Sequence, residues 1–163
     1  LQTGSYSYHA KHFDLFNEII QKQFKNFQPV AATKKIQFNL NNPGVNTIIE
    51  ADEYSINQIF HHLIDNDIKY THKGKDEITI NRSPRNNLYV DVADTGIGIA
   101  EEYLPLLFTP FSREEQGYTR NFEGNGLGLA LAKKYCELNR AEIKASSIKG
   151  KGTTFRVTFP NHD

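Results

Sequence analysis

Apolar and polar residues recur along the chain with two different periods, which predict helices in some segments and strands in others. From Asp14 onward the apolar residues repeat every three or four positions, the period of a helix, and we expect Pro29 to end this helix soon afterwards. A second helix is predicted after a capping Asp52, and a third over residues 127–138. The apolar positions of the first two helices are Phe16, Ile19, Ile20, Phe24 and Phe27, then Ile56, Ile59, Phe60, Leu63 and Ile64.

Shorter segments alternate between apolar and polar residues, and these predict strands. Residues 77–83 and 88–94 flank the turn signal Pro84-Arg85-Asn86-Asn87, which predicts a hairpin. The other predicted strands are residues 36–40 and 46–50, on either side of a turn signal at 41–44, and residues 141–147 and 153–160. Since helices and strands do not alternate regularly, we expect an α+β fold, a two-layer sandwich of a mixed or antiparallel sheet with helices packed on one face.

Composition narrows the class of protein. The 163 residues contain 38% hydrophobic residues and equal numbers of basic and acidic side chains, 19 of each, which predicts one folded domain and gives no general reason to bind nucleic acid. The single cysteine, Cys136, cannot form an internal disulfide, which favours the cytoplasm. No apolar run approaches the roughly 20 residues of a membrane span. Because the chain contains no methionine, we expect it to be a piece of a longer protein.

The second predicted helix carries a polar face with functional chemistry. His62, Asn66, Lys69 and Tyr70 follow the spacing i, i+4, i+7 and i+8, which places them on one side of the helix. An amide oxygen suits Mg²⁺, an ammonium group can meet a phosphate, and an aromatic ring can cover a base. The alternative is an ordinary solvated helix face.

Two glycine-containing segments could approach a ligand closely. The segment Asp94-Thr95-Gly96-Ile97-Gly98-Ile99 directly follows a predicted strand, so that its carboxylate could accept a hydrogen bond from an exocyclic amine. In residues 123–131, EGNGLGLAL, glycines lead directly into a helix, where bare N–H groups and the positive helix end favour an anion. Each segment, taken alone, could also be a structural turn.

The long segment between these two glycine-containing segments predicts a lid. Residues 95–125 contain one short helical patch, near 101–107, and loops of such length within a compact domain are usually functional.

Together, and in this order, the segments resemble the ATP-binding catalytic domain of two-component sensor histidine kinases, in the superfamily shared with DNA gyrase, mismatch-repair ATPases and heat-shock chaperones. The matching segments are HFDLFNEII (12–20), HHLIDNDIKYT (61–71, the asparagine box), DTGIGI (94–99, the first glycine box), LFTPF (107–111, the phenylalanine box), EGNGLGLALAKKY (123–135, the second glycine box) and GKGTTFRVTFP (150–160). The resemblance implies a Bergerat-type fold over residues 12–163, with residues 1–11 as a linker from a preceding dimerisation helix.

The resemblance also implies a site for Mg²⁺ and ATP. Asn66 would coordinate Mg²⁺, Lys69 would approach the phosphates, and Tyr70 would flank the adenine, whose amine Asp94 would hold. The other implied ATP-binding residues are Gly96, Gly98, Ile99, Phe108, Gly124, Asn125, Gly126, Leu127, Gly128 and Thr153, the last acting through water. Residues 109–123 would form the mobile lid, from which Arg113 or, preferably, Arg120 reaches the γ-phosphate.

Two residues depart from the family pattern. His62 stands where histidine kinases usually have Asn and related ATPases have Glu. Histidine is a poor Mg²⁺ ligand, but its ring could orient water or the acceptor imidazole, so we expect it to act in catalysis with Lys69 and Arg120. The alternative is a merely tolerated substitution. Asp67 replaces a small residue on the apolar side of the helix, where a buried carboxylate is costly. Either the helix rotates locally or Asp67 finds a donor.

The resemblance implies transfer of the γ-phosphoryl group of ATP to a histidine on a separate dimerisation domain, with a response regulator receiver domain as the next partner. The chain has no stretch typical of that acceptor histidine, so we expect a monomeric catalytic fragment of a homodimeric parent, which could be anchored in a membrane. The alternatives are a nucleotide-binding module without catalysis and a serine kinase of the anti-sigma type.

Overall fold

A five-stranded mixed sheet forms one layer of the protein. The computed structural model describes residues 6–109 and 126–161. The strands follow the order β2-β4-β5-β7-β6, in which β2 and β4 are parallel and all other neighbours are antiparallel. Their bounds are Gln37–Leu40 (β2), Lys75–Arg82 (β4), Leu88–Asp94 (β5), Glu142–Ile148 (β6) and Gly152–Thr158 (β7). The predicted hairpin is β4–β5, and the predicted closing strands are β6 and β7.

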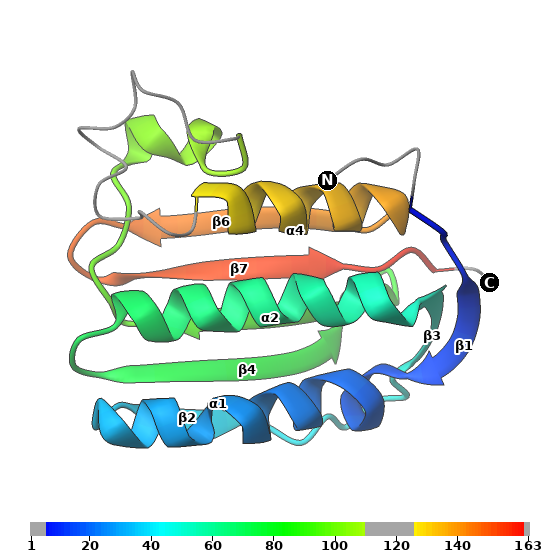
Figure 1. Ribbon diagram of the computed structural model, residues 1–163, viewed down its shortest axis with the longest axis horizontal. Helices are drawn as coiled ribbons and strands as arrows, with labels where there is room; N and C mark the ends of the chain where they lie inside the picture. The colour runs from blue at the N-terminus through cyan, green and yellow to red at the C-terminus, as the bar shows by residue number, and fades with distance from the viewer. Residues whose placement is uncertain (1–5, 110–125, 162–163) are drawn as a thin grey trace.

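Three helices, α1 (Gln21–Thr33), α2 (Glu53–Tyr70) and α4 (Gly126–Leu138), lie side by side over one face of this sheet (Figure 1). The helix α2 runs between the other two. Its apolar stripe is fully buried, as the sequence pattern predicts, and faces buried residues of the sheet such as Ile78, Val90 and Phe155. The core therefore lies between two layers, and the predicted α+β two-layer sandwich is confirmed.

A second, two-stranded sheet lies at one end of the molecule, on the right in Figure 1. It pairs β1 (Ala10–Asp14) with β3 (Ile48–Asp52) in antiparallel register. The sequence predicts no strand at 10–14, since residues 1–11 are interpreted as a linker, and in the structure this strand buries only Phe13. The strands β2 and β3 flank the predicted turn without pairing with each other, since β2 joins β4 and β3 joins β1. A local turn signal does not determine which partner a strand finds.

The first helix extends beyond Pro29, which corrects the expected end. A π-helical turn, η2 (Phe16–Ile20), leads directly into α1, and Pro29 lies inside α1, which continues to Thr33. Proline removes one N–H donor from the helix. Phe27 and Ala31, on either side of Pro29, are both buried, and the Thr33 hydroxyl donates to the Pro29 carbonyl at 3.0 Å. Burial of this apolar face outweighs the lost hydrogen bond.

The short helical patch predicted near 101–107 is the 3-10 helix η3 (Glu101–Leu106). Among the described residues, no helix has both the length and the apolar character needed to cross a bilayer.

Candidate functional site

The C-terminal half of α2 presents the predicted polar residues at one end of the molecule. Asn66 is only 3% exposed, and within residues 6–109 and 126–161 no hydrogen-bond donor reaches its Oδ1. Lys69 is exposed, with its Nζ 3.9 Å from Oδ2 of Asp65. An exposed ammonium in such a loose ion pair can exchange that partner for a phosphate at little cost.

His62 lies one turn before Asn66 and is half-buried. Its ring centre is 5.6 Å from that of His61. Burial, and then the neighbouring His61, lowers the pKa of His62 below its usual value. The imidazole is therefore neutral at neutral pH, and it can donate or accept a hydrogen bond without carrying charge.

Asp94, at the end of β5, is oriented by two backbone N–H groups. Its Oδ1 accepts hydrogen bonds from Gly96 N at 2.8 Å and from Thr153 N at 3.2 Å. The Gly96 backbone in turn lies against the end of α2, because a Cβ at this position would be 2.4 Å from the Tyr70 carbonyl oxygen. Three predicted site segments therefore meet here: the end of α2, the loop after β5 and the start of β7.

The same loop is fixed on its other side by the β6–β7 hairpin. Ile99 N donates to Ser147 Oγ at 2.7 Å, and Ser147 Oγ lies 2.8 Å from Thr153 Oγ1. Gly98 has a φ of +71°, and a Cβ there would be 2.2 Å from the Ile148 carbonyl oxygen. Sequence analysis missed Ser147, which lies in an ordinary strand pattern outside the recognised motifs.

Asp67 is 1% exposed and lies against Asp94, so α2 has not rotated to bring it to solvent. No donor from the described part of the chain reaches either of its carboxyl oxygens. Burial, and then the charge of Asp94, raises the pKa of Asp67 well above its usual value. The sequence led us to expect either a local rotation of the helix or a hydrogen-bond donor for Asp67, and in the described residues neither is found. The raised pKa favours the protonated carboxylic acid, whose own O–H can be donated toward Asp94.

The helix α4 begins at the predicted second glycine box. It starts at Gly126, followed by Leu127, which is 66% exposed, and a buried Gly128. The phenylalanine box contributes Phe108, whose ring centre lies 6.1 Å from that of the buried Phe155. Arg113, Arg120, Gly124 and Asn125 lie outside the described residues.

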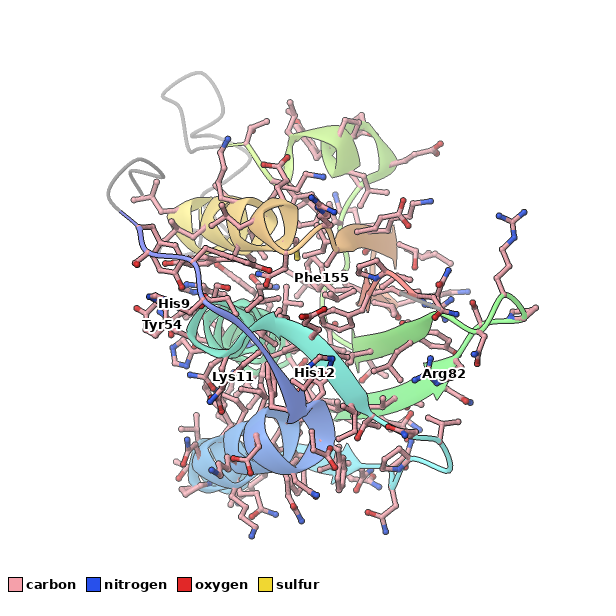
Figure 2. All side chains as sticks on the ribbon, turned by 90° about the vertical axis from the view of Figure 1, so that its right-hand side faces the viewer. His9, Lys11, His12, Tyr54, Arg82 and Phe155 are labelled. Carbon is pink, nitrogen blue, oxygen red and sulfur yellow. The ribbon has the colours of Figure 1, made fainter. Side chains whose placement is uncertain are left out.

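A separate hollow of about 410 Å³ lies at the opposite end of the sheet. His12 and Arg82 line it, beside the small sheet that faces the viewer in Figure 2, and Leu88 and Phe159 form its apolar floor. None of the predicted site residues contributes to this hollow.

Asn66, near the end of α2, has the chemistry of a magnesium ligand. The buried amide oxygen of Asn66 has no protein donor within reach in the described segments, and oxygen is the ligand that Mg²⁺ prefers. Among these same segments there is no group of three or more His, Cys, Asp or Glu side chains that could hold a metal by itself. Mg²⁺ typically takes few protein ligands and completes its shell with water and phosphate oxygens.

Residues 51–163 match the family described as "Histidine kinase-, DNA gyrase B-, and HSP90-like ATPase". The chain is 32% identical over 164 residues to the autoinducer 2 sensor kinase/phosphatase LuxQ of Vibrio cholerae, which covers 98% of this chain and 19% of LuxQ. It is 36% identical over 128 residues to the sensor histidine kinase WalK of Bacillus subtilis, covering 77% of this chain and 21% of WalK. The chain thus spans a minor part of the length of these relatives.

Solved structures agree with this assignment. The catalytic domain of the histidine kinase ThkA, in a nucleotide-free form, superposes with a TM-score of 0.76 at 25% identity, covering 93% of this chain and 95% of that one. Full-length ShkA in complex with AMPPNP gives 0.80 at 23% identity, covering 96% of this chain and 32% of that one, and so supports the fold. The chain therefore belongs to the histidine kinase-, DNA gyrase B- and HSP90-like ATPase family, as an ATP-binding domain of the two-component sensor histidine kinase type with the Bergerat fold.

Proposed function

We propose that the chain binds Mg-ATP and transfers the γ-phosphoryl group to a histidine on a separate dimerisation and phosphoacceptor domain. The observation that carries this proposal is the meeting of three segments around Asp94, whose carboxyl is held by Gly96 N and Thr153 N beside the end of α2. A carboxylate fixed in this way is an acceptor for the exocyclic amine of adenine.

The other residues of α2 have matching roles in the proposal. Asn66 Oδ1 is a ligand for Mg²⁺, which when bound neutralises charge on the phosphate oxygens. Lys69 exchanges Asp65 for a phosphate, and Tyr70 lies beside the base. Neutral His62 orients water or the acceptor imidazole by a hydrogen bond.

The second glycine box and the lid complete the proposed site. The first turn of α4 at Gly126, Leu127 and Gly128 offers free backbone N–H groups to the triphosphate, as helix N-termini do. Gly124, Asn125 and Arg120 lie outside the described residues, and they are assigned to triphosphate binding from the family resemblance alone. Ile99 and Phe108 line the pocket, and Gly98 shapes its floor.

The chemical step needs positioning and charge neutralisation more than covalent help from the protein. The unprotonated nitrogen of the acceptor imidazole forms a bond to the γ-phosphorus. The bond from that phosphorus to the oxygen that bridges it to the β-phosphate breaks, and ADP leaves with the electron pair. The acceptor histidine then passes the phosphoryl group to a receiver domain of a response regulator.

In this proposal the segment before β1 links the domain to the dimerisation helices of a homodimeric parent, which shortens the expected linker of residues 1–11, because Ala10 and Lys11 pair with β3. The isolated chain is a monomer in this proposal. The domain works in the cytoplasm, whether or not the parent is anchored in a membrane.

Two measurements test the proposal. Calorimetric titration with ATP should show binding that strengthens with Mg²⁺ in the native chain and weakens in Asp94→Asn, while Asp91→Asn, which alters a carboxylate on the other face of β5, binds normally. Mixing with the acceptor domain and ATP labelled at the γ-phosphate should then give an acid-labile phosphoprotein. Binding without any labelling would favour the module without catalysis, and an acid-stable product would favour the serine kinase.

A further inference from the structure

A buried threonine hydroxyl joins the end of α2 to a carboxyl group on β4. Thr71 Oγ1 lies 2.8 Å from the backbone oxygen of Asp67 and 2.7 Å from Oδ1 of Asp76. Thr71 is fully buried and Asp76 is 1% exposed, so water does not take the place of either contact.

These two contacts determine where the protons lie. A hydroxyl has one proton to donate, and a backbone carbonyl oxygen can only accept. When Thr71 donates to the Asp67 carbonyl, the usual bond of a threonine at a helix end, the contact with Asp76 needs a proton from Asp76. Both contacts are satisfied only when Asp76 is a carboxylic acid.

The groups around Asp76 favour that neutral form. Asp76 is the cross-strand partner of Asp94 in the β4–β5 register, which places both carboxyls on the same face of the sheet, and Asp67 of α2 lies above them. The one cation acting on Asp76 from the described elements is Lys34, whose Nζ donates to the carbonyls of Ile68 and Lys69 at 2.5 and 3.1 Å. No donor among those elements reaches Asp76 Oδ2. A buried carboxylate anion would need such a donor.

The titration of Asp76 falls in the neutral range. Burial, followed by the charge of Asp94, raises the pKa of Asp76 to about 7, against the opposing effects of the Thr71 hydrogen bond and Lys34.

We propose that Asp76 is a positioning residue that acts as a protonated acid through Thr71, and that loss of its proton weakens nucleotide binding at the neighbouring Asp94. This inference rests on the proposed function, because it concerns the regulation of that site.

The physical link runs through the last turn of α2. With Asp76 protonated, Thr71 donates to the Asp67 carbonyl and the turn that carries Lys69 and Tyr70 is closed. When Asp76 ionises, its carboxylate becomes the acceptor of the Thr71 O–H, and the backbone carbonyl of Asp67 loses its hydrogen-bond donor. The negative charges of Asp76 and Asp94 then lie opposite each other on neighbouring strands. Gly96, which lies against the Tyr70 carbonyl, transmits any movement of this turn to the proposed adenine site.

The test is a pH series of affinity for Mg-ADP on the native chain and on Asp76→Asn. Asparagine keeps the shape and donates its amide N–H to Thr71 Oγ1 at every pH. We expect the native chain to lose about threefold to tenfold in affinity, relative to Asp76→Asn, as the pH rises from about 6 to about 8.5. The ionisation of the ADP phosphates is common to both proteins and cancels in this ratio. Glu77→Gln, on the opposite face of the same strand, serves as the control and should keep the native profile.

A second measurement needs no variant. The carboxyl carbon of Asp76 in the ¹³C-labelled native chain should titrate near neutral pH, and its midpoint should rise when Mg-ADP binds. A midpoint near that of an ordinary aspartate, or parallel profiles for the native chain and Asp76→Asn, would overturn the inference. Absence of nucleotide binding at every pH would instead overturn the proposed function, while the NMR midpoint still reports whether Asp76 holds its proton.

Discussion

Asp67 lies against Asp94 at the junction of α2 and β5, and the pKa of Asp67 is raised further than that of Asp94, so Asp94 is the member of this pair that ionises first. Burial raises the pKa of both groups, but the hydrogen bonds that Asp94 accepts, from Asp67, Gly96 N and Thr153 N, offset part of its increase. Asp94, at the end of β5, is thus the better candidate for a charged acceptor, and the exocyclic amine of a nucleobase can reach it there.

The first prediction concerns the stability cost of the buried Asp67. Its pKa is higher in the folded state than in the unfolded state, so the folded chain binds an extra proton and its stability falls as the pH rises from about 4 towards the folded pKa. Asp67→Asn removes this titration and keeps a donor for Asp94. We expect the variant to be more stable than the native chain at pH 7 by more than about 1 kcal/mol, and nearly equal in stability at about pH 4.

Urea denaturation at the two pH values measures this difference. A gain in stability of the same size at both pH values would show that packing, rather than proton binding, distinguishes the variant.

The second prediction concerns Asp94 as the acceptor for adenine. Asp94→Asn replaces a charged acceptor with an amide, and hydrogen bonds to charged groups contribute about 1.5–3 kcal/mol. We expect ATP affinity to fall by about tenfold or more in calorimetry. Asp91→Asn, which breaks the outer-face ion pair of Asp91 with Arg156 at 2.7 Å, should leave the affinity unchanged. Equal losses in the two variants would contradict a specific role for Asp94.

The third prediction concerns the close approach of Gly96 to α2. A Cβ at Gly96 would lie 2.4 Å from the Tyr70 backbone oxygen and 3.0 Å from Asp94 Oδ1, so one of these groups must move in Gly96→Ala. We expect a loss of about 1–3 kcal/mol in stability together with weaker ATP binding. Gly44→Ala is the matched control, because nothing lies within 4 Å of a Cβ there. Thermal unfolding with and without ATP measures both effects, and an unperturbed Gly96→Ala would contradict the packing described.

The fourth prediction concerns the contact between the N-terminal segment and the start of α2. Tyr6 donates its hydroxyl to Asp52 Oδ2, and His9 N donates to Asp52 Oδ1 at 3.0 Å. Burial opposes ionisation of Asp52, but the hydrogen bonds from Tyr6, Ser55 and His9 prevail and lower its pKa. The stability that Asp52 contributes is therefore present above its unfolded pKa and is lost as the pH falls through the folded value.

Tyr6→Phe removes one of these donors. We expect a loss of about 1 kcal/mol at pH 7 that shrinks as the pH falls below about 4. The control is Tyr8→Phe, since Tyr8 is exposed. Chemical denaturation measures both variants, and a Tyr6→Phe cost that does not change with pH would assign the effect to lost packing against Tyr54 and Tyr135.

The features that sequence analysis predicted well are those set by local patterns. The apolar stripe of α2 has the helical period and is buried as expected, and the β4–β5 hairpin follows a clear turn signal. The motif around Asp94 correctly placed its carboxyl at a strand end, and the structure adds that Thr153, far away in the sequence, lies beside it.

The features that it missed depend on the three-dimensional surroundings. The strand β1 forms because β3 pairs with it. The helix α1 continues past Pro29 because Phe27 and Ala31, on either side of this proline, are buried. The protonated state of Asp67 depends on Asp94 and Asp76, which the chain brings together only on folding. Ser147 acquires its role in the same way, by lying opposite Thr153 in the β6–β7 hairpin.

The contact of the N-terminal segment and the proposed nucleotide site lie at opposite ends of one helix, α2. Tyr6 and His9 contact Asp52 where α2 begins, while Asn66, Lys69 and Tyr70 occupy the final turns of this helix, which is about 27 Å long for its 18 residues. Because the two ends of α2 are this far apart, the effects of substitutions there on stability should add, and the attachment of the N-terminal segment can be altered separately from the proposed nucleotide site.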